Sequence, residues 1–258
     1  MAKTFAAADT LSQRMEQLAP AMSVTKPDGA APFPAVVLLH GCGGRQPFLD
    51  RYAEVIRNAG AAAVIVDSFK PRQINKYMAY GTVCTGIQLW GRQRAGDLFA
   101  ALAWVRAQPW ADRDRLLAAG WSHGGWTILD ALALRPGPEM RRATGIVDLP
   151  NEPLQGLVGC FLAYPYAGRA SFAGRRPWRL SPHATAIVGG RDYIVGTAAP
   201  HSALKRLKGL GAPINIHLFE NATHAFDVPE AIDVRVRYDA KTTADSEKLL
   251  TQLIARVR

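Results

Sequence analysis

The chain has 258 residues, 48% of them hydrophobic, which is enough to bury a core without disulfide staples. Its formal charge is +10. No apolar run reaches the roughly 18 residues that a transmembrane helix needs, so no membrane partner is expected. Residues 1–20 lack a long apolar stretch and carry charges throughout, so we expect no signal peptide and a cytoplasmic protein.

Short apolar runs, bounded by Gly, Pro or a charged residue, alternate with helical patterns along the chain. Such runs are typical of strands that are buried on both faces of a parallel sheet. Residues 21–30 favour a further short strand at the edge of that sheet. The runs are residues 34–40, 61–67, 115–121, 157–164, 184–190 and 214–220.

Helical patterns fill the spaces between these runs. Alternation of strand and helix predicts an α/β fold, with a mostly parallel, doubly wound sheet flanked by helices on both faces. The sequence contains no internal repeat and no linker, so we expect a single domain over residues 1–258. The predicted helices are residues 48–59, 93–107, 124–134, 199–209 and 243–257.

Two segments rich in Pro, Gly and Arg, residues 135–156 and 165–183, interrupt the alternation. We expect them to be loop insertions near an active site, because ligands bind at the carboxyl ends of the strands. Arginines are denser over residues 168–179. No nucleic-acid motif accompanies them, so we interpret them as a solvated surface and expect no nucleic-acid partner. Nothing in the sequence sets the oligomeric state.

The three cysteines, Cys42, Cys84 and Cys160, are sparse and show no CxxC spacing. Neither a zinc site nor a disulfide framework is therefore indicated, and no metal site is predicted. Free thiols are the simplest expectation. A single pair between Cys42 and Cys84 is the alternative, because both fall in predicted loops.

The stretch "AAGWSHGGW" (118–126) places Ser122 directly after a predicted strand and directly before a predicted helix. Gly120 and Gly124 lie two residues to either side of it. A nucleophile elbow needs this context, because its tight turn leaves no room for side chains at those positions. A plain glycine turn with a capping serine is the alternative. We favour Ser122 as a nucleophile.

A serine nucleophile needs a histidine base and an acid that orients the base. In this kind of fold the chain order is Ser, then Asp or Glu, then His. Of the six histidines, His224 is the one that follows both the serine and the end of a predicted strand. Asp192 follows the preceding strand, so neighbouring strand ends would bring the two together. Asp227 and Asp148 are weaker candidates for the acid.

The stretch "LLHGCGG" (38–44) ends a predicted strand with glycines, which let backbone approach a ligand closely. It predicts the N–H of Cys42 as one oxyanion donor, with the N–H of His123 at the helix start as the other. A phosphate-binding loop is the alternative. The stretch lacks G-x-x-x-x-G-K followed by Ser or Thr, and no G-x-G-x-x-G opens a helix, so a nucleotide is not expected.

Together with "VIVDSFKPR" (64–72), "GGRD" and "NATHAF", these motifs resemble the α/β-hydrolase fold, and within it the dienelactone hydrolase family. The resemblance runs from about residue 20 to the C-terminus. It implies a triad of Ser122, Asp192 and His224, and an oxyanion hole of Cys42 and His123. The best-known members carry a cysteine nucleophile, so Ser122 makes this a serine-nucleophile variant, which suits ordinary ester hydrolysis.

The sequence thus predicts a serine hydrolase that cleaves carboxylic esters or lactones through an acyl-enzyme on Ser122, without metal or organic cofactor. Alternatives are a peptidase of the same fold, or a dienelactone hydrolase proper acting on a carboxylate-bearing lactone. Arg72, Tyr164 and Trp126 are candidates for substrate contact. Family members hold a substrate carboxylate with arginines, and those in loops here are Arg45, Arg72, Arg169, Arg175, Arg176 and Arg179.

Overall fold

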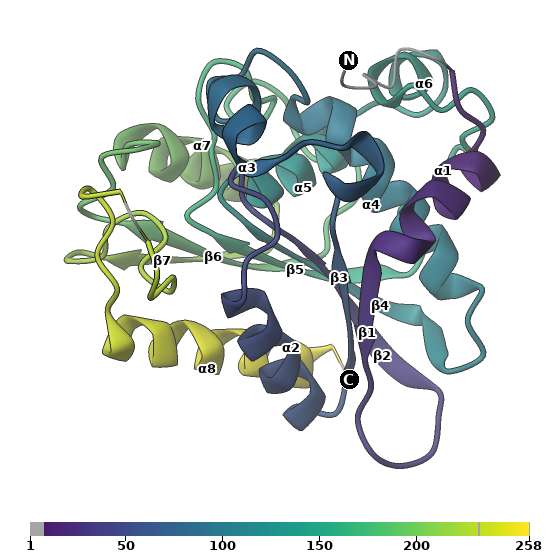
Figure 1. Ribbon diagram of the computed structural model, residues 1–258, viewed down its shortest axis with the longest axis horizontal. Helices are drawn as coiled ribbons and strands as arrows, with labels where there is room; N and C mark the ends of the chain where they lie inside the picture. Colours follow the sequence, from purple (N-terminus) through teal and green to yellow (C-terminus); the bar gives the residue numbers. More distant parts are fainter. Residues whose placement is uncertain (1–7, 232, 258) are drawn as a thin grey trace.

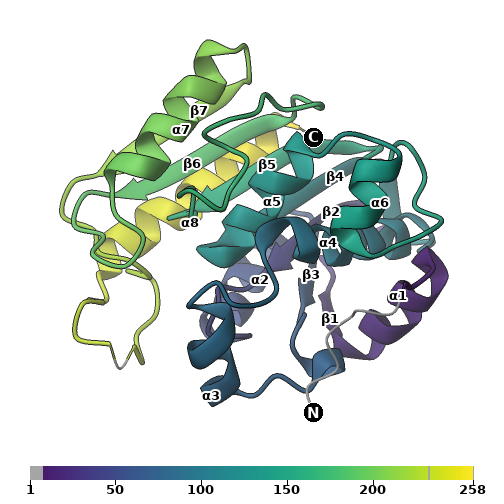
Figure 2. The same ribbon diagram turned by 90° about the horizontal axis from the view of Figure 1, so that it is seen from above.

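The computed structural model describes residues 8–231 and 233–257. A seven-stranded sheet in the order β1-β3-β2-β4-β5-β6-β7 forms its middle layer, with helices on both faces (Figures 1 and 2). The α/β fold is therefore confirmed. The strands are β1 (Met22–Thr25), β2 (Phe33–Leu39), β3 (Ala62–Val66), β4 (Ala111–Trp121), β5 (Leu157–Ala163), β6 (His183–Gly189) and β7 (Ile214–Phe219).

All six predicted strands of the parallel sheet are present, and β1 is the expected short edge strand. It pairs antiparallel with β3, whereas the remaining neighbours pair in parallel. The inner strands are buried on both faces, since Ala35, Val37 and Leu39 pack into one core and Val36 and Leu38 into the other. This two-sided burial explains why the strands read as continuous apolar runs.

Helices α2 (Phe48–Asn58) and α8 (Ala240–Arg256) cover one face of the sheet, below it in Figure 1. The other face is covered by α1 (Leu11–Leu18), α4 (Gly91–Arg106), α5 (His123–Ala133) and α7 (Ala198–Gly209). The five predicted helices are thereby confirmed. No helix in the described part of the chain combines the length and apolar character that a membrane span requires.

Several short helical elements are absent from the predictions. Helix α1 begins with a reciprocal cap, in which Thr10 Oγ1 accepts from Gln13 N–H and Gln13 Oε1 accepts from Thr10 N–H. Helix α6 (Pro138–Thr144) replaces part of the expected loop 135–156; Pro138 opens it and Gly145, at φ 72°, ends it. Between β3 and α4 lie η2 (Lys70–Arg72), α3 (Lys76–Met78) and the π-turn η3 (Ala79–Val83).

A buried ionic cluster joins three of these elements. Asp97 of α4 lies 2.7 Å from Arg72 of η2 and 3.1 Å from Arg14 of α1, measured between charged side-chain atoms. Burial acts to raise the pKa of Asp97, but the two guanidiniums outweigh it and hold that pKa below its usual range. The cluster ties the N-terminal helix and the β3–α4 connection to the sheet.

Candidate active site

Ser122 lies in the turn between β4 and α5, at φ 52° and ψ −110°. Residues other than glycine rarely adopt a positive φ, and such strain is concentrated at functional sites. A Cβ at Gly120 would lie 2.4 Å from the carbonyl carbon of Gly124, and a Cβ at Gly124 would lie 2.1 Å from Leu39 O. Both glycines are therefore required by the close packing. The Ser122 side chain caps nothing, which disfavours the capping alternative.

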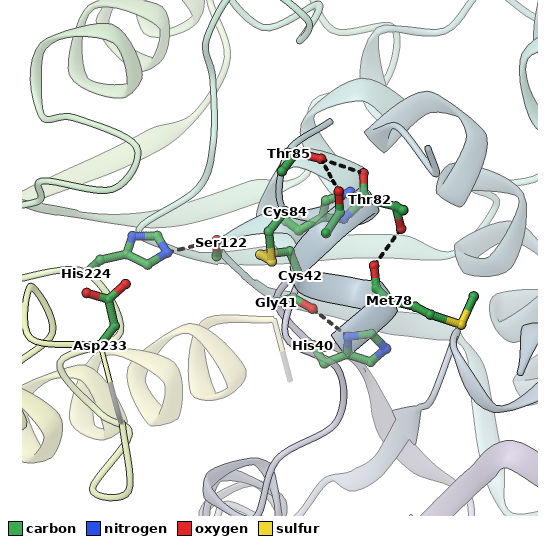
Figure 3. The surroundings of a disulfide bond; sticks show 12 residues. His40, Gly41, Cys42, Met78, Thr82, Cys84, Thr85, Ser122, His224 and Asp233 are labelled. Atoms are coloured by element: carbon green, nitrogen blue, oxygen red, sulfur yellow. Dashed lines mark hydrogen bonds between the residues drawn. A yellow bond between two sulfur atoms is a disulfide. The ribbon is translucent and has the colours of Figure 1, made fainter. Parts of the chain in front are cut away.

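A hydrogen-bonded chain runs from this serine through His224 to Asp192. Ser122 Oγ lies 2.9 Å from His224 Nε2, and His224 Nδ1 lies 2.7 Å from Asp192 Oδ2 (Figure 3 shows the first pair). The other carboxylate oxygen of Asp192 accepts from the N–H groups of Ile194 and Val195 at 2.9 and 3.0 Å. Asp192 and His224 follow the adjacent strands β6 and β7, which is why residues so far apart in sequence meet.

The other two candidate acids have different partners. Asp227 is buried, and its Oδ2 accepts from the Tyr52 hydroxyl at 2.9 Å and from Trp121 Nε1 at 3.0 Å. Its Oδ1 accepts from the Tyr164 hydroxyl at 2.5 Å. Asp148 accepts from a backbone N–H of α1. Neither carboxylate is within hydrogen-bonding distance of the histidine in the chain just described.

The two predicted oxyanion donors lie on either side of the serine. A Cβ added to Gly41 would be 3.6 Å from Ser122 Cβ, so the loop after β2 approaches Ser122 closely. His123 is the first residue of α5, where the helix dipole favours negative charge. Within the described chain, neither Cys42 N–H nor His123 N–H donates a hydrogen bond, which leaves both for a ligand oxygen.

His40 fixes the peptide that carries the first donor. Its Nε2 accepts from Ser68 N–H at 3.2 Å, so its proton lies on Nδ1, which donates to Gly41 O at 2.7 Å. That carbonyl belongs to the same peptide group as Cys42 N–H. His40 precedes Ser122 in the chain, so the order Ser, Asp, His does not point to it, and residue spacing carries no signal for its positioning role.

The buried side chain of Arg94 contacts residues next to both predicted donors. It donates from Nη1 to His40 O at 2.7 Å and from Nε to Ser68 Oγ at 2.9 Å, and its Nη1 lies 3.3 Å from His123 Nδ1. Burial lowers the pKa of Arg94 to about 10, so it is charged at neutral pH. Burial, together with this charge, lowers the pKa of His123 to about 3, so His123 is neutral. This residue was not predicted either.

Two family models match parts of the chain. The prolyl oligopeptidase family model matches residues 84–138, which include the Ser122 turn, and the dienelactone hydrolase family model matches residues 166–257, which include Asp192 and His224. The seven-stranded sheet and these matches lead to one assignment. The chain has the α/β-hydrolase fold. Its predicted resemblance to the dienelactone hydrolase family is also confirmed. None of the curated proteins matches the chain.

Solved structures of other α/β-hydrolases superpose over most of the chain. A Klebsiella pneumoniae protein assigned to the dienelactone hydrolases is 16% identical, with a TM-score of 0.68 over 91% of this chain and 92% of its own. Esterase 2 of Thermogutta terrifontis, phosphonylated by cyclosarin, is 15% identical (TM-score 0.67; 92% and 88%). A dienelactone hydrolase-like promiscuous phosphotriesterase from metagenomic libraries is 19% identical (TM-score 0.63; 92% and 99%).

A disulfide lies beside Ser122. Cys42 and Cys84 are bonded, with their Cα atoms 5.1 Å apart, so the expectation of free thiols is wrong for this pair (Figure 3). Cys84 directly follows η3 and is exposed. The bond therefore ties the oxyanion loop to the helical segment 70–84. Cys160 is free and buried in β5.

A cavity of about 840 Å³ opens over Ser122 and His224. Its walls come mainly from residues 41–48, 67–84 and 224–236. None comes from 135–156 or 165–183, because α6 packs against α4 and the second segment lies along α5. Residues 165–183 nevertheless begin beside the serine turn, since Tyr166 N–H donates to Ser122 O at 3.3 Å, and the placement of both segments near the active site stays a prediction.

One of the three predicted substrate contacts lines this cavity. Tyr164 does so, and its ring packs edge-on against that of His224 with centroids 4.8 Å apart. Arg72 and Trp126, the other two candidates, do not line it. Arg72 is buried against Asp97, and Trp126 is buried with its Nε1 donating to a carboxylate of α5 at 2.8 Å.

The arginines of the cavity already have carboxylate partners. Arg45 lies 2.5 Å from Asp50, and Arg235 lies 2.6 Å from Asp233. Of the six loop arginines considered for substrate, Arg45 is the only one in the cavity wall of the described chain. No arginine of that wall thus presents an unpaired guanidinium to a ligand.

Proposed function

We propose that the protein is a serine hydrolase that cleaves carboxylic esters or lactones through an acyl-enzyme on Ser122. The observation that carries the proposal is the chain of two hydrogen bonds from Ser122 Oγ through His224 to Asp192, at the floor of an open cavity. This geometry suits a nucleophile, a general base and a residue that orients the base.

The steps follow from the positions of the atoms. Ser122 Oγ attacks the carbonyl carbon while His224 Nε2 takes its proton, and Asp192 stabilises the imidazolium that forms. The N–H groups of Cys42 and His123 donate to the oxyanion of the tetrahedral intermediate. His224 then protonates the leaving alcohol, and a water molecule activated by the same histidine releases the acid.

An uncharged ester is favoured over a carboxylate-bearing lactone. Both cavity arginines are paired with aspartates, and Phe48, Phe69 and Ile74 give the wall an apolar character. Two lysines also line the wall: Lys70, whose ammonium donates to Pro20 O at 3.2 Å, and Lys76. Esterase 2 of Thermogutta terrifontis was solved with butyrate bound, which supports short acyl groups as first substrates to test. The match of residues 84–138 to the prolyl oligopeptidase model keeps a peptidase as the second candidate.

Covalent labelling by a fluorophosphonate probe tests the nucleophile. We expect the wild type and Ser202→Ala, a change on the exposed surface of α7, to be labelled, and Ser122→Ala to remain unlabelled. Peptide mapping should place the adduct at Ser122. An adduct in the Ser122→Ala variant, or none in the folded wild type, would overturn the proposal.

A panel of p-nitrophenyl esters, lactones, carboxylate-bearing esters and matched anilides tests the substrate class. We expect short-chain esters to have the highest kcat/KM, and all activity to disappear in Ser122→Ala. Faster cleavage of an anilide than of its matched ester would favour the peptidase.

We also propose that the chain acts as a single domain, because its helices pack on one sheet. A cytoplasmic location stays a prediction.

A further inference from the structure

Three arginines line a second cleft, which is separate from the catalytic cavity. Arg92 lies in the first turn of α4, and Arg169 and Arg175 lie in segment 165–183. Together with Trp90 and Phe172 they line a cleft of about 580 Å³. None of these residues is in the wall of the cavity around Ser122. The cleft is the location of the arginine-rich stretch that the proposed function leaves unused.

Two of the three guanidinium groups, those of Arg92 and Arg175, are held by aromatic rings and backbone carbonyls. Arg92 stacks over Trp90, with Cζ 4.0 Å from the ring centroid, and its Nη1 donates to Ala170 O at 3.4 Å. Arg175 Nη2 donates to Ser171 O at 3.3 Å. Because part of their rotamer entropy is already lost in the free protein, less is lost when these side chains bind a ligand.

The loop that carries two of the arginines is anchored to α5 by a buried carboxylate. Asp130 Oδ1 accepts from Ser171 Oγ at 2.9 Å and from Phe172 N–H at 2.7 Å. Phe172 in turn packs under the guanidinium of Arg176, whose Cζ lies 3.9 Å from the ring centroid. The base of the cleft is therefore built from fixed hydrogen bonds rather than from free surface side chains.

The positive charge in the cleft lacks carboxylate partners. Among the residues that the structure describes, Arg92, Arg169 and Arg175 form no ion pair. The nearby Glu139 pairs with Arg176. Partial burial lowers the pKa of Arg92, and repulsion from Arg175 adds to this effect, although Asp130 opposes it. The N-terminus of the long helix α4 contributes further positive potential.

We propose that this cleft binds the phosphate group of a small molecule. A single carboxylate would leave most of the positive charge uncompensated, whereas a phosphate or diphosphate carries several charges and oxygens that match guanidinium forks. The compact cleft favours a small ligand over nucleic acid, which binds along a track of many phosphate contacts.

Titration calorimetry with inorganic pyrophosphate tests the proposal. We expect one pyrophosphate per chain, and affinity that falls as NaCl is raised from about 50 to about 200 mM. Arg169→Gln and Arg175→Gln should each weaken binding about tenfold. Both side chains are exposed, so their replacement leaves the core intact. Arg113→Gln removes the same charge from an exposed site at the start of β4 and should change affinity less than about twofold.

Parallel titrations with succinate, a single-stranded oligonucleotide and vesicles of phosphatidic acid in phosphatidylcholine identify the source of the anion. Ester hydrolysis and the melting temperature, which the Arg169 and Arg175 variants should retain, report on the fold. The proposal is overturned if pyrophosphate does not bind, if Arg113→Gln weakens binding as much as the cleft variants, or if succinate binds equally well. Binding of the oligonucleotide or vesicles without pyrophosphate would assign the cleft to a macromolecule and overturn it as well.

Discussion

At the residue scale, the local requirements of Ser122 determine its neighbours. Its positive φ raises the side chain above the sheet, and this turn brings Gly124 against Leu39 O of β2. A residue with a Cβ at position 124 would separate β2 from α5, and with them the two proposed oxyanion donors. The positive φ of Ser122 therefore depends on the glycines around it, because only residues without a Cβ let the backbone segments of this turn pack so closely.

Replacement of Asp192 by Asn separates its orienting role from its structural one. The backbone bonds from Ile194 and Val195 end on Oδ1, which Asn keeps, so the fold should be retained. Loss of the charge next to His224 Nδ1 should lower kcat about 10⁴-fold, as in other serine hydrolases with this arrangement. Steady-state hydrolysis of the best ester measures it. Asp233→Asn, in the cavity wall, is the control, and similar losses in both variants would argue against the assignment.

Asp130 gives the stability of the protein a defined pH dependence. Burial raises its pKa to about 6, so between about pH 4 and about pH 6 the native state holds a proton that the unfolded state has released. Stability should therefore fall as pH rises through this window, by up to about 3 kcal/mol, and the contribution is absent above it. Urea unfolding of wild type and Asp130→Asn at several pH values measures the difference. A wild type that gains stability relative to Asp130→Asn as the pH rises through this window would contradict the raised pKa of Asp130.

At the scale of elements, the segment from η2 to η3 is attached to the catalytic loop by one covalent bond. This segment forms one wall of the cavity, and its buried apolar residues, Ala79 and Val83, form a small cluster with the flanking Phe69 and Leu89. The start of the segment is held by the ion pair of Arg72 with Asp97, and its end is held by the Cys42–Cys84 bond. The same bond restrains the backbone of Cys42, whose N–H is the proposed oxyanion donor.

Cys84→Ser should lower kcat more than it raises KM, because the loss falls on the oxyanion donor. Removal of one such donor costs about 10²- to 10³-fold in kcat, and a loosened donor should cost less than that. Dithiothreitol should lower the kcat of the wild type to a similar level and leave Cys84→Ser unchanged. A wild type that is insensitive to complete reduction would show that the loop holds its shape without the bond.

The long elements were predictable from sequence and the short ones were not. Residues such as Val37 and Ile65 lie in apolar runs because helices cover both faces of their strands, and the pattern shows this directly. Helices α3 and α6 and the turn η3 are too short for a period to appear, and tertiary contacts hold them. Arg72 and Trp126 lie outside the cavity wall, and the sequence does not show that their polar atoms contact the buried carboxylates of Asp97 and Asp130.

At the scale of the whole molecule, an ionic cluster links the N-terminal helix to the body of the fold. Asp97 is fully buried and faces two guanidiniums, those of Arg14 and Arg72. Replacing both charges of a buried pair is often tolerated, but removing one partner leaves the other uncompensated in a medium of low polarity.

Asp97→Asn should therefore destabilise the protein by about 3–5 kcal/mol, because Arg72 and Arg14 each lose a buried, charged partner, although Arg14 keeps its ion pair with Asp9. Asp112→Asn is the matched control: its partner Arg115 is partly exposed, so its loss should cost less than about 1 kcal/mol. Urea unfolding followed by tryptophan fluorescence measures both. Equal costs in the two variants would show that the cluster contributes no more than a surface pair.

The disulfide also bears on where in the cell the protein can work. The third cysteine of the chain, Cys160, is buried, and burial raises the pKa of its thiol. Cys160 therefore does not compete with Cys42 and Cys84 for a disulfide partner. Disulfides are rare in the cytosol, where glutathione and thioredoxin keep thiols reduced, so this bond and the predicted cytoplasmic location point in opposite directions. Alkylation of the protein directly in cell lysate decides between the two locations, because only free thiols react. In a reducing compartment the loop that carries Cys42 would lose its covalent link to Cys84, and in an oxidising compartment it would keep that link.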